Sequence, residues 1–406
     1  MKIACDVLTL KDALQNVQRA VAGKSTIEVL EGVLIKAKSQ NEILVCGYNL
    51  EIGITKMVPA KIEMPSSFVI DAKIIVDILR KSASNEVLID FNEKTLDVLV
   101  VSGESKFYIK ALRGEDFPSL PSVEDGESIE LEMHSLKKMV RQTIFAASST
   151  DENPISMGAL FNIEEGVLTL VCVDGFRLSK TCLHLNLKED FKANFVVPAK
   201  SLAELVRLMP EEKESGSSKE EERDNTENEP SEKINEENSS TTSERVESVA
   251  VTVVFGKKHI IFNVAGYSVI SRLLEGNFLD YKSAIPKTSL YKIEANTREF
   301  IDSIERVSIL INERTKSPVR LKFTEGLINF YCNSPLGVSE DKLCVDFKGE
   351  SFEIGLNSKY ILDALKNTDT DVVNLEFSGP LAPVKVTSLQ GDSFVFLVLP
   401  VRLVAE

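Results

Sequence analysis

The sequence is poor in the residues that build metal centres and disulfide frameworks. It has only three histidines, and His134, His184 and His259 lack the spacing of metal ligands. Its six cysteines lie in apolar stretches and form no Cys-x-x-Cys motif. We therefore expect buried free thiols in a reducing compartment, and neither a metal site nor a cofactor.

Long apolar runs are missing as well. No stretch reaches the about 18 residues that a membrane-spanning helix needs. The first seven residues, Met1 to Val7, are too polar and too short for a signal peptide. The composition, 43% hydrophobic and 27% charged, is typical of a soluble globular protein. We expect a cytoplasmic protein that has no membrane partner.

Recognisable catalytic motifs are also absent. The sequence contains no GxxxxGK[ST] phosphate loop, no GxGxxG after a strand, no HExxH and no GxSxG. Its acidic residues show no pairing that would identify a catalytic dyad, and a turn explains Asp174-Gly175. We expect a protein that is not an enzyme, with an unrecognised enzyme as the fallback.

One stretch, a short extended run that leads into an amphipathic helix, is present three times. It occupies residues 68–80, 195–207 and, more loosely, 352–366. In each copy a base is followed four residues later by an acid and seven later by a base, as in Lys73, Asp77 and Arg80. These positions share one helical face and apolar residues fill another. One copy would suggest an ordinary solvated helix, but three copies indicate a repeated architecture.

The repeats divide a chain of 406 residues, which is too long for a single core. In each round a strand and a helix precede several strands, the repeat helix and further strands. This order predicts an α+β fold of three tandem domains. The expected boundaries are 1–125, 126–287 and 288–406.

A polar segment interrupts the middle domain. Residues 211–248 contain 14 acidic and 5 basic residues, a net charge of −9. Such a segment cannot bury enough apolar surface to offset its ordering entropy, so we expect a disordered insert. A tolerated surface insertion and a partner-binding or modified segment both stay open as its role.

The remaining charge is distributed unevenly. The net charge of the whole chain is −15. The six predicted helices together have a net charge of +8, and the rest of the chain has a net charge of −23. Basic helices on an acidic body indicate a surface that faces a polyanion while the rest repels it.

Four motifs, found in this order within the repeats, resemble the bacterial DNA polymerase III beta subunit, the sliding clamp family. They are N-L-E-I-G-I at 49–54, D-G-F-R-L at 174–178, S-R-L-L-E-G-N-F-L-D-Y at 271–281 and V-L-P-V-R-L at 398–403. The resemblance covers the chain except the acidic insert. It implies that each domain packs two helices on antiparallel sheets. It also implies that two chains close head-to-tail into a six-domain ring around DNA, as a non-catalytic processivity factor.

The resemblance and the repeat pattern together suggest which bases contact DNA. Lys24 and Lys200 match basic contacts of the family, and the others come from the repeat pattern or from helix charge. The candidates are Lys24, Lys73, Arg80, Lys137, Lys138, Arg141, Lys200, Arg207, Lys359 and Lys366. For each one, a merely solvated surface base is the alternative.

The resemblance further implies a groove between the second and third domains that takes short peptides ending in apolar residues. Its expected lining is Val173, Gly175, Phe176, Arg177, Leu178, Leu279, Leu397, Val398, Leu399, Pro400, Val401, Arg402 and Leu403. The peptides would come from the polymerase III catalytic subunit, the clamp loader and other proteins with clamp-binding motifs. Leu279, Ser156, Ser283 and Ala284 depart from the family pattern and leave the groove's depth and peptide preference open.

The ring implies an interface between two copies of the chain. The strand K-F-Y-I-K offers Phe107 and Ile109, and the segment S-I-L-I-N offers Ile309 and Leu310. Burial of these four residues within their own domains is the alternative. At the level of function, the alternative is a partner-recruiting scaffold that does not encircle duplex DNA.

Overall fold

The computed structural model describes residues 1–150, 152–188, 190–211, 250–311 and 317–403. The acidic insert predicted at 211–248 lies outside the described residues, except for Glu211.

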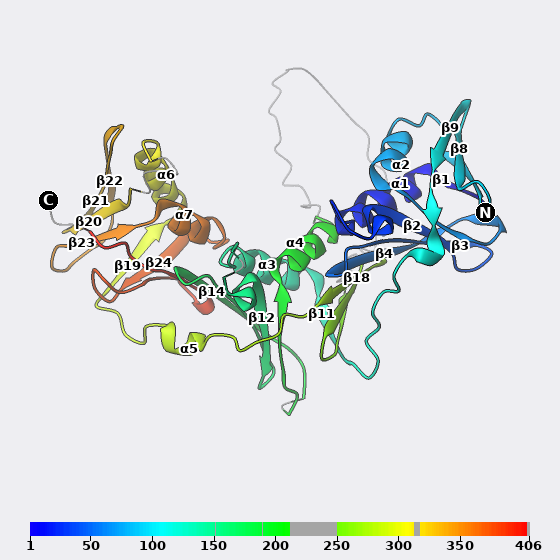
Figure 1. The fold of residues 1–406 in the computed structure, drawn as a ribbon. Coiled ribbons are helices and arrows are strands. Elements are labelled where there is room, and N and C mark those ends of the chain that lie inside the picture. Colours follow the sequence, from blue (N-terminus) through cyan, green and yellow to red (C-terminus); the bar gives the residue numbers. More distant parts are fainter. Residues whose placement is uncertain (151, 189, 212–249, 312–316, 404–406) are drawn as a thin grey trace, which may run out of the picture.

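The described chain forms an open arc with long helices along its concave side and strands toward its convex side (Figure 1). The N-terminal elements lie in one lobe and the C-terminal elements in the other. The helices are α1 Val7–Val17, α2 Ala72–Arg80, α3 Met133–Ile144, α4 Ala199–Leu208, the short α5 Tyr281–Ala284, α6 Thr297–Ser308 and α7 Ser358–Lys366.

The strands form four antiparallel sheets, and neighbouring strands in each sheet are hydrogen-bonded in the following spatial order. The first sheet has five strands, β5 Lys61–Met64, β1 Lys2–Asp6, β7 Glu86–Asn92, β8 Asp97–Ser102 and β9 Ser105–Lys110. The second has nine strands, β10 Leu112–Arg113, β6 Ser67–Asp71, β2 Gly32–Ala37, β3 Glu42–Tyr48, β4 Ile52–Pro59, β18 Tyr267–Arg272, β17 His259–Val264, β16 Ala250–Phe255 and β11 Glu127–Glu132.

The remaining two sheets lie toward the C-terminus. The third has eight strands, β15 Ala193–Pro198, β12 Gly158–Glu164, β13 Val167–Val173, β14 Arg177–His184, β26 Gly391–Val398, β25 Val384–Ser388, β24 Val372–Phe377 and β19 Tyr291–Asn296. The fourth has four strands, β22 Gly337–Cys344, β21 Leu327–Ser334, β20 Val319–Thr324 and β23 Phe352–Leu356.

Three units of the same design make up this fold. Unit I contains β1–β10 with α1 and α2, unit II contains β11–β18 with α3 and α4, and unit III contains β19–β26 with α6 and α7. The two helices of each unit pack against each other. The predicted threefold α+β repeat is therefore confirmed.

Local chemistry explains how several strands pass into a helix, although Pro198 before α4 provides no side-chain cap. A short polar side chain at the end of the strand accepts a hydrogen bond from a backbone N–H of the first helical turn. Asp6 and Asp71 do so before α1 and α2, at 2.7 and 2.8 Å, and Asn296 does so before α6 at 3.0 Å. Such N-caps satisfy donors that the helix itself leaves unpaired.

The units are joined by continuous sheets. Between units I and II, β4 pairs with β18, and Gly53 lies opposite Ile270. Between units II and III, β14 pairs with β26, and Leu178 lies opposite Leu397. Because backbone hydrogen bonds cross both junctions, the arc is held by sheet pairing in addition to side-chain packing.

The six cysteines differ in access, which gives a testable prediction. Cys5, Cys46, Cys172 and Cys332 are buried, whereas Cys344 is exposed. Burial raises the pKa of the Cys5 and Cys46 thiols to about 12 and also raises those of Cys172 and Cys332. Because the thiolate is the nucleophile, iodoacetamide at neutral pH should alkylate Cys46 at least about a hundredfold more slowly than Cys344.

Mass spectrometry of tryptic peptides would measure these alkylation rates, and the urea-unfolded protein serves as the control in which all the cysteines react. Equal rates for Cys46 and Cys344 in the native protein would contradict the packing described for unit I.

Candidate functional sites

The basic residues predicted to contact DNA lie mostly on the helices of the concave side (Figure 1). One group is exposed and forms no ion pair within the described residues. Its members are Lys24, Lys73, Arg141, Lys200 and Lys359. These cations are available to an external anion without breaking an internal contact.

A second group is exposed but paired with carboxylates. Its ion pairs are Arg80 with Asp77 at 3.2 Å, Arg207 with Glu204 at 2.6 Å, Lys366 with Glu305 at 2.6 Å and Lys138 with Asp369 at 4.0 Å. Exposed ion pairs of this kind contribute about 0–1 kcal/mol to stability. A phosphate group could therefore replace the carboxylate at little cost.

The acid of the repeat motif does not pair with the lysine four residues before it. Glu204 instead lies near Arg19 of unit I, at 3.6 Å, and Asp363 pairs with Arg177 of unit II. The second and third copies of the charge pattern thus place their acids at contacts between units, while Lys200 and Lys359 stay free for solvent or a ligand.

Lys137 is placed differently from its prediction as a DNA contact. Its side chain is only 8% exposed, and its Nζ donates to the carbonyl oxygens of Met209 and Pro210 at 3.2 and 3.0 Å. The ammonium group therefore holds the chain that follows α4, where a cation also interacts favourably with the helix dipole. Lys137 is therefore not available as a DNA contact.

Replacing Lys137 by methionine should lower the free energy of unfolding by about 1–3 kcal/mol, because two carbonyl groups lose a charged donor. DNA affinity should stay unchanged. Thermal denaturation followed by circular dichroism would measure the loss, with the exposed neighbour Lys138→Met as the control. A neutral effect of Lys137→Met on stability would contradict this role.

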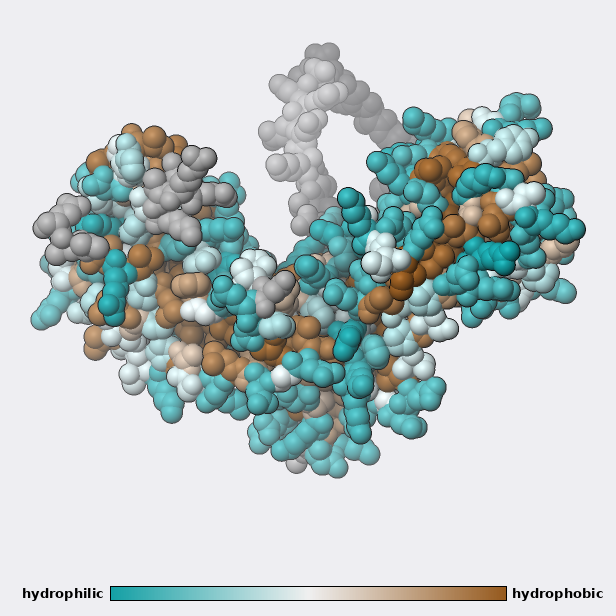
Figure 2. All heavy atoms as spheres, viewed as in Figure 1, coloured by the Kyte–Doolittle hydropathy of each residue, from teal (hydrophilic) through white to brown (hydrophobic). Residues whose placement is uncertain are grey.

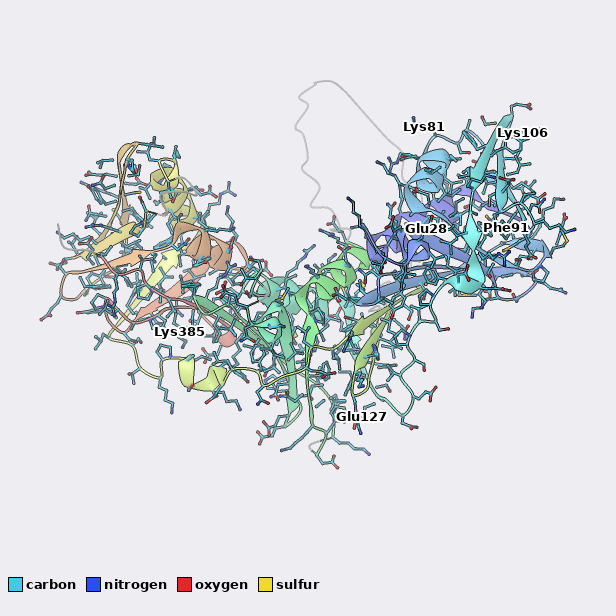
Figure 3. The ribbon with its side chains drawn as sticks, in the orientation of Figure 1. Glu28, Lys81, Phe91, Lys106, Glu127 and Lys385 are labelled. Carbon is cyan, nitrogen blue, oxygen red and sulfur yellow. The ribbon has the colours of Figure 1, made fainter. Side chains whose placement is uncertain are left out.

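Two further exposed bases lie on or next to helices of the concave side and were not predicted from the sequence. Lys81 follows α2 and is exposed, and Arg298 is exposed in the first turn of α6. Figure 3 places Lys81 beside α2. Lys81 directly follows the repeat stretch, so extending the pattern by one residue would have found it.

The predicted groove lies at the junction of units II and III, where a tight turn precedes β14. The Oδ1 atom of Asp174 accepts hydrogen bonds from the backbone N–H groups of Phe176 and Arg177, both at 3.0 Å. Gly175 has a φ of 88° there, a left-handed conformation that glycine adopts without strain. The turn leaves Phe176 59% exposed.

Arg177 ties this turn to unit III. Its guanidinium pairs with Asp174, where Nε lies 2.9 Å from Oδ2, and with Asp363 of α7. It also lies over the ring of Tyr360, 4.7 Å from the ring centre, and Phe176 stacks on the same ring at 6.0 Å. Tyr360, which the sequence did not place in the groove, is therefore part of this site.

Beneath the turn lies an apolar cluster, called the II–III cluster below. It consists of Ile155, Leu160, Val171, Val173, Leu178, Val196, Tyr281, Val395 and Leu397. The predicted residues Val173, Leu178 and Leu397 are thus brought together, although all three are buried. The more exposed predicted residues are Phe176, Leu279, Leu399, Val401 and Arg402.

Val398 departs from the prediction that it lines the groove. Its side chain is buried in the core of unit III, because neighbouring residues of β26 alternate between the two faces of the sheet. Beyond β26, Pro400 and Leu403 are half-buried, and the Val401 N–H donates to the Gly355 carbonyl oxygen at 2.8 Å. The chain end therefore crosses the edge of the fourth sheet.

The four residues predicted for the interface lie at the two ends of the arc. Phe107 is exposed and Ile109 half-buried on β9, the edge strand of the first sheet. Ile309 is 77% exposed after α6, and the half-buried Leu310 lies close to Gly337 at the start of β22. Figure 2 shows hydrophobic atoms at the tip of the C-terminal lobe, around the β21–β22 hairpin and α6.

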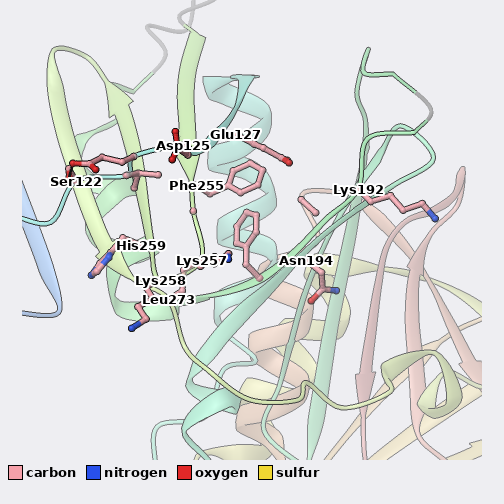
Figure 4. Close-up of a pocket in the computed structure, with 15 residues that line it drawn as sticks. Ser122, Asp125, Glu127, Lys192, Asn194, Phe255, Lys257, Lys258, His259 and Leu273 are labelled. Carbon is pink, nitrogen blue, oxygen red and sulfur yellow. Dashed lines mark hydrogen bonds between the residues drawn. The ribbon is translucent and has the colours of Figure 1, made fainter.

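A cavity with a volume of about 720 Å³ lies elsewhere, on the convex side of unit II (Figure 4). Its lining includes the acidic residues Glu124 and Glu127 and the basic residues Lys257 and Lys258, which lie in the turn between β16 and β17.

The described residues contain no group of three or more side chains that could hold a metal ion. Among the helices in this part of the chain, none is long and apolar enough to cross a membrane.

Comparison with known proteins agrees with the repeat. Models of the DNA polymerase III beta subunit match in three consecutive parts, the N-terminal domain over residues 1–121, the central domain over 130–217 and the C-terminal domain over 282–402. The beta sliding clamp of Bacillus subtilis is 28% identical over 413 residues, which cover 99% of this chain and 100% of that protein. The beta sliding clamp of Staphylococcus aureus is 29% identical over 399 residues, or 96% of each chain.

Solved structures give the same result. A putative DNA polymerase III beta subunit from Eubacterium rectale superimposes with a TM-score of 0.86 at 30% identity, and the match covers 99% of this chain and 100% of that one. The DNA polymerase sliding clamp of Bacillus subtilis gives a TM-score of 0.86 at 28% identity and covers both chains fully.

Proposed function

Because the chain belongs to the DNA polymerase III beta subunit family, we propose that two copies close head-to-tail into a ring that encircles duplex DNA. As a sliding clamp, the protein confers processivity on a DNA polymerase without any catalysis of its own. The observation that supports a ring is the way in which the three units are joined within one chain.

Both internal junctions follow one rule. The strand that follows the turn in one unit pairs with the last strand of the next unit, as β4 does with β18 and β14 with β26. Unit III has the corresponding strand β22, and in unit I the strand that corresponds to β18 and β26 is β9. Both are sheet edges within the described chain. Pairing of β22 with the partner's β9 would join four strands to five and give another nine-stranded sheet.

The internal junctions also predict the register of this contact. Val338 lies four residues after the start of its turn at Ser334, as Gly53 does after Asn49. Tyr108 lies six residues before Gly114, as Ile270 does before Gly276.

Since Gly53 pairs with Ile270, Val338 would lie opposite the partner's Tyr108. Two residues further along the antiparallel strands, Glu340 would lie opposite the partner's Lys106. This is an attractive cross-strand pair. Figure 3 shows Lys106 at the far end of the N-terminal lobe.

We propose that the concave helices face the DNA. Lys24, Lys73, Arg141, Lys200 and Lys359 are the primary contacts, and the paired bases Arg80, Lys138, Arg207 and Lys366 are secondary ones. Contacts from lysine and arginine to phosphates are independent of sequence, so they allow a ring to slide.

The II–III cluster and the exposed residues around it, including Phe176, Leu279 and Leu399, are proposed to bind short peptides that end in apolar residues. The polymerase III catalytic subunit, the clamp loader and other proteins with such motifs are the proposed partners, in the cytoplasm. The stacked pair Phe176 and Tyr360 gives an aromatic wall on which an apolar side chain can pack.

A scaffold that recruits partners without encircling DNA is the less favoured function, because the relatives that match nearly the whole chain are named sliding clamps. Sedimentation equilibrium tests the ring first. A mass of twice 45.0 kDa supports it, whereas a monomer at micromolar concentration would contradict the proposed pairing of β22 with β9.

A further inference from the structure

The junction between units I and II has the same local build as the junction between units II and III. At the first junction the Oδ1 atom of Asn49 accepts hydrogen bonds from the backbone N–H groups two and three residues later, at 3.0 and 2.9 Å, as Asp174 does at the second. The next residue, Leu50, has a φ of 74°, close to the 88° of Gly175. The two turns are therefore equivalent.

The apolar clusters behind these turns also correspond. In both units the central strand of the cluster pairs with its two neighbours in the same register, so residues of the first cluster have counterparts in the second. The matched pairs are Leu34 with Leu160, Cys46 with Val171, and Val69 with Val196. The I–II cluster, which includes Val29, Leu34, Cys46, Tyr48 and Val69, is thus a second copy of the II–III cluster.

The two copies differ most in how the space above the cluster is filled. Where the II–III cluster has Leu178, the I–II junction has Gly53, and the linker residue Leu120 occupies the space above it. A Cβ atom added to Gly53 would lie only 2.5 Å from Cδ2 of Leu120 and 2.8 Å from Cγ2 of Ile270. Phe117 of the same linker is buried in the I–II cluster, whereas Phe278 of the following linker is only half-buried against the II–III cluster.

We propose that the I–II junction is a second peptide site of the same design, closed in cis by linker residues Phe117 to Leu120. The linker supplies two apolar side chains three residues apart, so it acts as a tethered ligand for the surface that it covers. This closure leaves one open peptide site per chain. The proposal rests on the proposed function of the II–III cluster.

The test removes the tethered side chain and counts the bound peptides. A fluorescently labelled peptide that ends in Leu-Phe and carries a photo-crosslinker is titrated onto the full-length protein and its Leu120→Gly variant. The wild type should bind one peptide per chain, crosslinked near Phe176. Leu120→Gly should bind two, with the new crosslink near Leu50.

Two variants control this result. Leu120→Met keeps an apolar side chain over Gly53 and should bind one peptide per chain. Gly53→Ala displaces the Leu120 side chain without shortening it and should also allow a second peptide to bind. This variant tests the proposal even if Leu120→Gly is unstable.

The outcomes separate the two proposals. One peptide per chain for the wild type, Leu120→Gly and Gly53→Ala alike would overturn the tethered ligand while leaving the II–III site intact. No binding by the wild type would instead contradict the proposed peptide function.

Discussion

Reversing the charge of Lys24 and Lys200 together, as Lys24→Glu with Lys200→Glu, is expected to abolish retention on DNA. Both lysines are exposed and form no ion pair within the described residues, so their replacement should not disturb the fold. The change removes four phosphate contacts per ring. The slope of log affinity against log salt should fall by about 4, and the affinity should drop at least about a hundredfold at low salt.

Fluorescence anisotropy with a labelled duplex, repeated at several salt concentrations, would measure both quantities. The matched control is Lys257→Glu with Lys258→Glu, which changes the charge by the same amount on the exposed turn between β16 and β17. The concave helices would not be the DNA-facing surface if both double variants weakened binding equally. Peptide binding at the II–III cluster should persist in all variants.

Replacing Ile309 by aspartate is expected to convert the dimer into monomers. The side chain is 77% exposed in the single chain, so the unit III fold should tolerate the change. In the ring this residue would be covered by the partner at both interfaces. An unpaired carboxylate buried there costs several kcal/mol, which raises the dissociation constant of the dimer at least about a thousandfold.

Sedimentation velocity over a range of concentrations would measure this loss. Leu381→Asp is the matched control, because that leucine is 70% exposed elsewhere in unit III. A dimer of unchanged stability in Ile309→Asp would show that the ends of the arc do not meet as proposed.

The register of the interface can be tested by a charge swap. Lys106→Glu and Glu340→Lys should each weaken the dimer by placing like charges opposite each other. The two substitutions together should restore it. Failure of the double variant to recover would contradict the inferred register, even if Ile309→Asp confirms the interface.

Much of the repeat architecture is readable from the sequence because each repeat carries its own local signals. The stretch at 68–80 folds as β6 followed by α2, as its switch from an extended run to helical spacing predicts. Asp71 at the switch point caps the helix. Signals of this kind depend only on near neighbours along the chain, so no knowledge of tertiary contacts is needed.

Positions that depend on distant partners were harder to predict. The sequence predicts that Lys137 is a base exposed to solvent or DNA. In the structure the chain after α4 covers it and supplies carbonyl acceptors. Val398 belongs to the predicted terminal motif, but its face of β26 depends on pairing with β14 and β25. The close approach of Leu120 to Gly53 likewise depends on how the linker crosses β4. Such facts arise from packing between segments and leave no local pattern.

The measurement that tests the central claim most directly is retention of the clamp on nicked circular DNA, followed by linearisation with a restriction enzyme. The protein is loaded with the clamp loader that is proposed as its partner, and bound protein is separated by gel filtration. Encirclement predicts stable retention on the circle and loss within the time needed to slide off after cutting. Equal retention on circular and linear DNA would contradict a topological ring and indicate ordinary surface binding.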